Sequence, residues 1–184
     1  MNNDNAAVGM VASLMVLAAR TAPKAKGIDI IGTCIASGED LGCLSDAMHE
    51  YGKTHDMGFF IRDSANVAAS DACLIIAARG QVVTGVNCRG CGYPTCEAMA
   101  AAFRERPDDF PPFRGPNCVL RMADLGIAVG SAVKTAALHN VDNRVMYSAG
   151  VGALVLGWFP EYTVAYGIPL KASGKNIFFD RASS

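Results

Sequence analysis

The chain has 184 residues, a length that suits one compact domain with its own hydrophobic core. About half of the residues (51%) are hydrophobic, and 16 basic residues nearly balance 17 acidic ones, for a formal charge of −1. No basic run or acidic tail occurs, which argues against nucleic acids and anionic membrane surfaces as partners. The seven cysteines are an odd number without the spacing of a secreted disulfide framework, so a reducing, cytoplasmic compartment is expected.

The first expected element is an apolar helix at about 6–20, which ends before Pro23. Its apolar run could imitate a signal peptide, but no positively charged side chain precedes it. The run is also too short to span a bilayer, so no membrane span is expected. A polar residue near the start of the chain is expected to cap this helix: Asn3, Asp4 or Asn5.

Strands and helices then alternate along the chain. The isoleucine-rich segment 28–36 and the apolar segment 72–78 are predicted to be buried strands. Further strands are expected at 144–147 and 163–168. Further helices are expected at 39–55, 64–69, 95–106, 119–138 and 151–159. The pattern predicts a single α+β (α/β-like) domain over 1–184, with a mixed sheet and flanking helices.

The character of the sequence changes over 85–118, where prolines, glycines and four cysteines surround one short helix. This segment is predicted to be an insertion built around a ligand rather than around a hydrophobic core. Its cysteines follow the spacing C-x2-C-x4-C-x21-C: Cys88, Cys91, Cys96 and Cys118. Three thiolates in one short loop can hold three corners of an iron–sulfur cluster while the fourth ligand returns from a distance, as in several ferredoxins. Gly90 and Gly92 are expected to supply the positive φ angles of such a loop.

The spacing favours a 4Fe–4S cluster over two alternatives. A plant-type 2Fe–2S site has the two short spacings in the reverse order. A structural zinc site with four cysteine ligands usually has two separate C-x2-C pairs, whereas this chain has one, and zinc is therefore the rival occupant. The other cysteines are interpreted as buried core thiols: Cys34, Cys43 and Cys73.

Residues beside the cysteines suggest how a cluster would be stabilised. Thr95 is expected to cap the helix that follows it, and Asn117 the helix that starts near Cys118. Two of the ligands would then lie at helix N-termini, where the helix dipole stabilises negative charge. Arg89 and Arg114 either add to this positive field or simply face water.

The segment 88–96, together with the later Cys118, resembles the 4Fe–4S domain of electron-transfer complex and corrinoid-protein subunits in anaerobes. Taken whole, the chain resembles a family of uncharacterised bacterial and archaeal proteins that contain a ferredoxin domain. Family markers at 19–27 and 174–181 extend the resemblance over almost the entire chain. The resemblance implies a 4Fe–4S protein, oxygen sensitivity and an anaerobic host, but no defined reaction.

A second, weaker resemblance concerns a flavin. The segment 19–27 is similar to the segment by which nitroreductase-like flavoproteins contact FMN, and 124–138 with 148–152 is similar to later helices of that fold. This resemblance implies a nitroreductase-like fold and an intertwined homodimer. It also implies flavin contacts from Lys24, Lys26, Gly27, Lys175 and Arg181. The side chains of the three lysines and of the arginine would neutralise the FMN phosphate. The alternative is that these lysines are solvated.

Three functions remain open from the sequence. The first is electron transfer, in which a 4Fe–4S cluster passes electrons to a redox partner protein or to a small-molecule acceptor. The second is an FMN-dependent, iron–sulfur-containing oxidoreductase. The third is a structural zinc protein with four cysteine ligands. The cysteine spacing favours the first.

Overall fold

The computed structural model describes residues 3–105 and 113–179. Its centre is a four-stranded sheet with the strand order β1-β2-β4-β3. The strands are β1 (Ile31–Ala36), β2 (Ala72–Ala78), β3 (Asp142–Asn143) and β4 (Val164–Lys171). Neighbouring strands all pair antiparallel, so the expected α+β class is confirmed and the described sheet is antiparallel rather than mixed.

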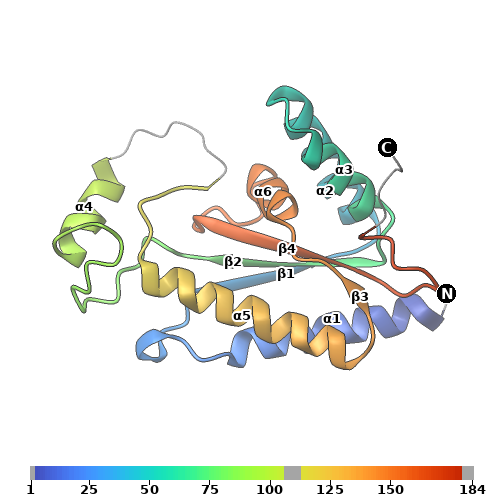
Figure 1. Cartoon of the computed structure of the whole chain (residues 1–184), viewed down its shortest axis with the longest axis horizontal. Coiled ribbons are helices and arrows are strands. Elements are labelled where there is room, and N and C mark those ends of the chain that lie inside the picture. The colour runs from blue at the N-terminus through green and yellow to red at the C-terminus, as the bar shows by residue number, and fades with distance from the viewer. Residues whose placement is uncertain (1–2, 106–112, 180–184) are drawn as a thin grey trace.

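Helices cover both faces of the sheet and give the molecule three layers (Figure 1). One face carries α1 (Asn3–Thr21) and α5 (Val119–Leu138). The other face carries α2 (Glu39–Thr54), α3 (Gly58–Ala68) and α6 (Tyr147–Val155). The helices predicted at 6–20, 39–55 and 119–138 are confirmed, with ends that differ by a few residues at most.

The central strand β2 organises both layers of the core. It pairs with β1 on one side and β4 on the other, and all seven of its residues are buried. Successive side chains point to opposite faces. Leu74 and Ile76 pack under α1 and α5, whereas Cys73 and Ile75 pack under α2 and α6. Burial on both faces explains the uninterrupted apolar run that predicted this strand.

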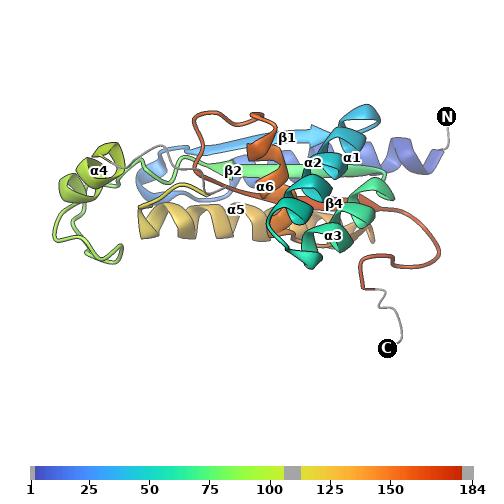
Figure 2. The same ribbon diagram turned by 90° about the horizontal axis from the view of Figure 1, so that it is seen from above.

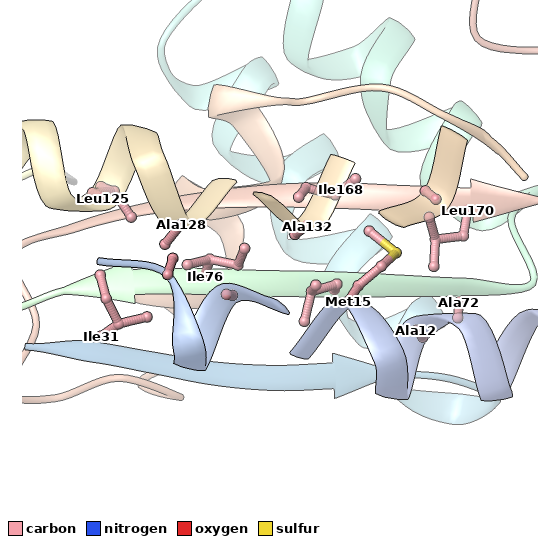
Figure 3. Packing of buried hydrophobic residues seen from close by; sticks show 14 of the residues in the cluster. Ala12, Met15, Ile31, Ala72, Ile76, Leu125, Ala128, Ala132, Ile168 and Leu170 are labelled. Carbon is pink, nitrogen blue, oxygen red and sulfur yellow. The ribbon is translucent and has the colours of Figure 1, made fainter. Parts of the chain in front are cut away.

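Small side chains let the two long helices approach the sheet closely. In Figure 3, residues of α1 and α5 lie over the central strands. The labelled residues are Ala12, Met15, Ile31, Ala72, Ile76, Leu125, Ala128, Ala132, Ile168 and Leu170. Alanines at the contact points bring the helix backbones near the sheet, while methionine and the larger aliphatic side chains fill the remaining space.

The largest error of sequence reasoning lies around α6. A strand was expected at 144–147 and a helix at 151–159, but α6 already begins at Tyr147 and ends at Val155. Only β3 and an isolated bridge between Met146 and Gly167 pair with β4 here. The glycines of this segment serve packing: a Cβ on Gly150 would collide with the backbone of Ala165. Tertiary contact therefore overrides the low helix propensity of glycine.

Smaller differences concern two other boundaries. α3 begins at Gly58 rather than at 64, because Phe60 and Val67 on one face of the helix are both needed in the core. β1 begins at Ile31 rather than at 28, since the preceding Asp29 turns its carboxylate back to accept from the Ile31 N–H. The strand expected at 163–168 is confirmed and runs on to Lys171.

The cysteine-rich segment projects from one end of the sheet. It contains α4 (Cys96–Glu105), which matches the helix predicted at 95–106. Figures 1 and 2 agree that α4 lies beyond the ends of the strands, far from the N-terminus of α1. A 3-10 turn, η1 (Ala25–Gly27), lies between α1 and β1. No helix in the described ranges is both long and apolar enough to cross a membrane.

We expect Gly150→Ala to lower the free energy of unfolding by about 3 kcal/mol, at the upper end of overpacking costs, because its Cβ would meet backbone atoms that cannot move aside. Gly130→Ala is the matched control. Gly130 lies on α5 with open space around its Cβ position, so alanine there should stabilise by up to about 1 kcal/mol. Denaturant unfolding followed by circular dichroism measures both; equal stabilities would contradict the close packing of α6.

Candidate metal centre

The two ends of the cysteine-rich segment are both fixed to the same end of the sheet. After β2 the chain turns at Gly80, whose N–H donates to Thr163 Oγ1 (3.0 Å) and whose carbonyl accepts from the Cys118 N–H (2.8 Å). Asn117 is held as well, because its Oδ1 accepts from the Thr163 hydroxyl (2.7 Å). The segment therefore leaves and re-enters the domain at a single point.

The loop that carries the first three cysteines is closed by a reciprocal pair of hydrogen bonds. The Cys96 N–H donates to Asn87 Oδ1 (2.8 Å), and the Asn87 N–H donates to Cys96 Sγ (3.3 Å). Thr95 Oγ1 accepts from the Ala98 N–H (3.1 Å), which confirms the predicted cap of α4. A metal-ligand sulfur that accepts an amide hydrogen bond is a common feature of thiolate sites.

The glycines of the loop act in two different ways. Gly92 has a positive φ of 86°, as expected. The other left-handed positions are Asn87 (49°) and Arg89 (60°), not Gly90, so the expectation for Gly90 is wrong. Gly90 is needed for space instead: a Cβ there would lie 2.6 Å from Val119 Cγ1. This contact seats the loop on the residue that follows Cys118.

Cys118 occupies the N-cap position of α5 and is 3% exposed. Burial raises the pKa of its thiol, but hydrogen bonds from the Arg121, Thr84 and Leu120 N–H groups and from the Thr84 hydroxyl lower the pKa further than burial raises it. Thr84 Oγ1 lies 3.8 Å from Cys118 Sγ. The site therefore favours the thiolate, the form that binds metal.

One of the flanking residues does not have its expected role. Asn117 does not cap α5, because its amide donates to the Arg114 carbonyl (2.7 Å) and its oxygen is bound by Thr163. Arg114 reaches away to the Pro160 carbonyl (3.1 Å), and its side chain is exposed. Arg89 is exposed as well, which favours the interpretation that it faces water.

The structure gathers the four motif cysteines at one end of the molecule but not into one coordination sphere. Cys88 is exposed, Cys91 and Cys96 are half-buried, and Cys118 is buried. Among the described residues, which include all four, no three His, Cys, Asp or Glu side chains lie close enough to hold a metal ion. The donor set itself, four thiols, suits an iron–sulfur cluster or zinc. The ligand assignment therefore stays a prediction.

A buried ion pair next to Cys118 escaped the sequence reasoning. Arg121 Nη1 and Asp124 Oδ2 on α5 lie 3.0 Å apart, and the two side chains are 0% and 4% exposed. Arg121 also donates to the Val82 and Ala25 carbonyls (both 3.1 Å), and Asp124 Oδ1 accepts from the Ala25 N–H (2.8 Å). Two opposite charges three positions apart on the first turns of an otherwise apolar helix were the signal that could have revealed it.

The lysines expected to bind a flavin phosphate lie apart from one another. Lys24 Nζ donates to the carbonyls of Ala19, Arg20 and Ala22 at the end of α1, at 2.6 to 3.0 Å. The ammonium of Lys26 lies near Gly85, where the cysteine-rich segment begins.

The remaining expected flavin contacts are Gly27, Lys175 and Arg181. Gly27 adopts a positive φ of 65° in η1, next to Lys26. The segment that follows β4, which contains Lys175, lies at the end of the sheet opposite to the connection between α1 and β1 in both views (Figures 1 and 2). Arg181 lies outside the described residues. One chain therefore does not bring the described lysines to a single phosphate.

The other three cysteines differ in exposure. Cys73 is fully buried on β2, as expected for a core thiol. Cys34 on β1 is only half-buried. Cys43 is exposed, because it lies on the outer side of α2, while Leu41 and Leu44 of the same helix face the core. The expectation of a buried thiol is therefore wrong for Cys43.

Sequence comparison identifies relatives over the whole chain. The family described as "Uncharacterized protein containing a ferredoxin domain" matches residues 114–181, and a region described as "Putative Fe-S cluster" matches residues 85–109. An uncharacterised protein of the archaeon Archaeoglobus fulgidus is 43% identical over 178 residues, which cover 97% of this chain and 94% of that protein.

Solved structures share the fold at low sequence identity. Nitroreductase A from Vibrio parahaemolyticus is 11% identical with a TM-score of 0.55, over 91% of this chain. An oxidoreductase containing FMN is 12% identical with a TM-score of 0.58, over 90% of this chain and 67% of its own. The chain spans only 59% of the length of the nitroreductase. The expected nitroreductase-like fold is confirmed; likeness at this identity extends to the fold alone.

We expect thiol alkylation of the cluster-free protein to separate the cysteines. At about pH 8, iodoacetamide should modify exposed Cys43 and Cys88, whereas Cys73 should not react, because burial raises its pKa to about 12 and denies access to the reagent. Peptide mass spectrometry before and after unfolding in guanidinium measures this. Modification of Cys73 in the folded protein as fast as of Cys43 would contradict its place in the core.

Proposed function

Because the chain belongs to the family of proteins that contain a ferredoxin domain, we propose that it binds a 4Fe–4S cluster and transfers single electrons. The cluster region of the family covers three of the motif cysteines, and the fourth lies at the start of α5. The proposed ligands are Cys88, Cys91, Cys96 and Cys118.

The contact between Gly90 and Val119 is the observation that carries this proposal. It places a loop with three cysteines, spaced as in ferredoxins, directly on the residue next to the fourth. The pair of hydrogen bonds between Asn87 and Cys96 closes that loop at its base. Metal binding would then complete the site by drawing the thiols of this loop toward Cys118.

The residues around the cluster would hold its negative charge. A bound 4Fe–4S cluster supplies reversible one-electron transfer. The Thr84 hydroxyl lies 3.8 Å from Cys118 Sγ at the start of α5, and the ammonium of Lys26, beside Gly85, adds positive charge. The exposed Cys88 marks the side from which a redox partner protein or a small acceptor would approach.

A second candidate function is an FMN-dependent, iron–sulfur-containing oxidoreductase. It is supported by the nitroreductase-like fold and by the FMN that one of the structural relatives, the oxidoreductase, contains. Lys26 and Gly27 lie near Gly85, where the cysteine-rich segment begins, so a flavin bound there would be close to the cluster. The intertwined homodimer that the fold resemblance implies belongs to this candidate.

We expect the anaerobically purified protein to show a broad absorbance near about 400 nm that bleaches with dithionite. Ligand substitution identifies the donors: serine at each of the four motif cysteines should lower the iron and sulfide content. Cys43→Ser is the matched control, because Cys43 is also exposed but lies on α2, and it should retain iron. Zinc without iron would reject the cluster, and iron loss confined to Cys73→Ser would reject the ligand set.

For the flavin candidate, we expect FMN to be released on denaturation of the purified protein and Lys26→Ala to weaken FMN binding about tenfold or more, since a charge-assisted hydrogen bond would be lost. Lys53→Ala, at an exposed position of α2 on the other face of the sheet, should bind FMN like the parent chain. Fluorescence titration of the flavin-free protein measures both. Absence of bound FMN together with no saturable binding would reject this candidate and leave electron transfer alone.

A further inference from the structure

We propose that the buried pair Arg121–Asp124 is a positioning device for Cys118, so that it controls retention of the cluster and its reduction potential. This inference rests on the proposed cluster ligation by Cys118. It assigns to the pair a role that neither the cysteine spacing nor the fold resemblance provides.

The pair joins three separate segments, of which two border Cys118. Arg121 belongs to the first turn of α5, the helix that has Cys118 as its N-cap. Its guanidinium donates to the Val82 carbonyl, two residues before Thr84, whose hydroxyl lies 3.8 Å from Cys118 Sγ. One side chain therefore fixes the start of α5 to the segment that carries the hydroxyl beside the sulfur.

The third segment is the turn η1. Arg121 donates to the Ala25 carbonyl, and Asp124 accepts from the Ala25 N–H, so both polar groups of that residue are held by the pair. The next residue is Lys26, whose side-chain nitrogen lies 3.8 Å from the position a Cβ on Gly85 would take. The pair thus holds the backbone next to this cation, beside the start of the cysteine-rich segment.

The cost of burial argues that this pair does more than stabilise the fold. Both side chains are almost completely buried, and removing two charges from water commonly costs as much as their attraction returns. Arg121 Nη2 also has no hydrogen-bond partner within the part of the chain that the structure describes. Hydrophobic residues would fill this place at lower cost, whereas only charged groups with directed hydrogen bonds can fix three backbone segments at once.

A second ion pair in the same fold provides a matched control. Asp71 accepts from Lys171 (2.7 Å) and from the Ala172 N–H (3.0 Å), just as Asp124 accepts from Arg121 and from a backbone N–H. Its side chain is 7% exposed. Asp71 comes directly before β2, and this end of the sheet is opposite to the end that carries the four motif cysteines. Substitution there removes a comparable interaction without touching the surroundings of Cys118.

The test compares Asp124→Asn with Asp71→Asn in the full chain reconstituted with iron and sulfide. Cluster loss to an iron(II) chelator should be about tenfold to a hundredfold faster in Asp124→Asn, the usual effect of removing an outer-shell partner, and near the parent rate in Asp71→Asn. The midpoint potential should become more positive only in Asp124→Asn, because a negative charge near the cluster is removed. Asp124→Glu keeps the charge and should restore both the rate of cluster loss and the midpoint potential in part. It replaces Asp124→Asn in this comparison if the asparagine variant does not fold.

The proposal is overturned if either the chelation rate or the potential of Asp124→Asn equals that of Asp71→Asn. A readout that needs no cluster separates this result from failure of the proposed function. In the metal-free chain, iodoacetamide should modify Cys118 faster in Asp124→Asn than in Asp71→Asn, because Thr84 and the first turn of α5 are no longer fixed around its sulfur. A parent chain that takes up no iron rejects the proposed function, and equal Cys118 alkylation in the two variants rejects the positioning role.

Discussion

Burial of β2 between two layers of helices is the constraint on which the rest of the structure depends. All seven residues of this strand are buried, and both of its edges are paired. Both faces must therefore be covered, by α1 and α5 on one side and by α2, α3 and α6 on the other. The close approach of α6 to β4, which Gly150 permits, is one consequence.

The end of β2 also decides where the cysteine-rich segment can be attached. Beyond Ala78 the chain leaves the core, and Gly80 binds the backbone of Cys118 across the gap that the segment bridges. α4 lies outside the two apolar clusters, and Met99 is its one fully buried residue. With so little buried apolar surface, the segment suits a geometry that a ligand completes, the role that the proposed cluster would have.

The combination of fold and motif limits what each can say about function. A nitroreductase-like fold is a scaffold that supports different chemistries, so the shared topology does not carry a reaction to this chain. The cysteine spacing is more specific, because the number and order of thiolates determine which cofactors can be held. The same holds for a lysine of the proposed flavin contacts. Lys24 donates to carbonyls at the end of α1, a structural role that does not depend on a flavin.

Sequence alone determined the features that depend on local pattern. Strand β2 follows from a run of apolar residues, and helices α2 and α5 follow from apolar residues at helical spacing. The Thr95 cap and the cysteine spacing can be read directly from neighbouring positions. The shape of the loop was only partly predictable. Gly90 is needed because a side chain there would collide with Val119, and not because its backbone requires a positive φ.

Only the tertiary structure decided the features that join distant segments. It placed α6 by contact with β4, exposed Cys43, and brought Arg121 and Asp124 together with Ala25 and Val82. The physical reason is that burial and long-range hydrogen bonds depend on which surfaces meet, and no local pattern records the partner that a side chain will find across the fold.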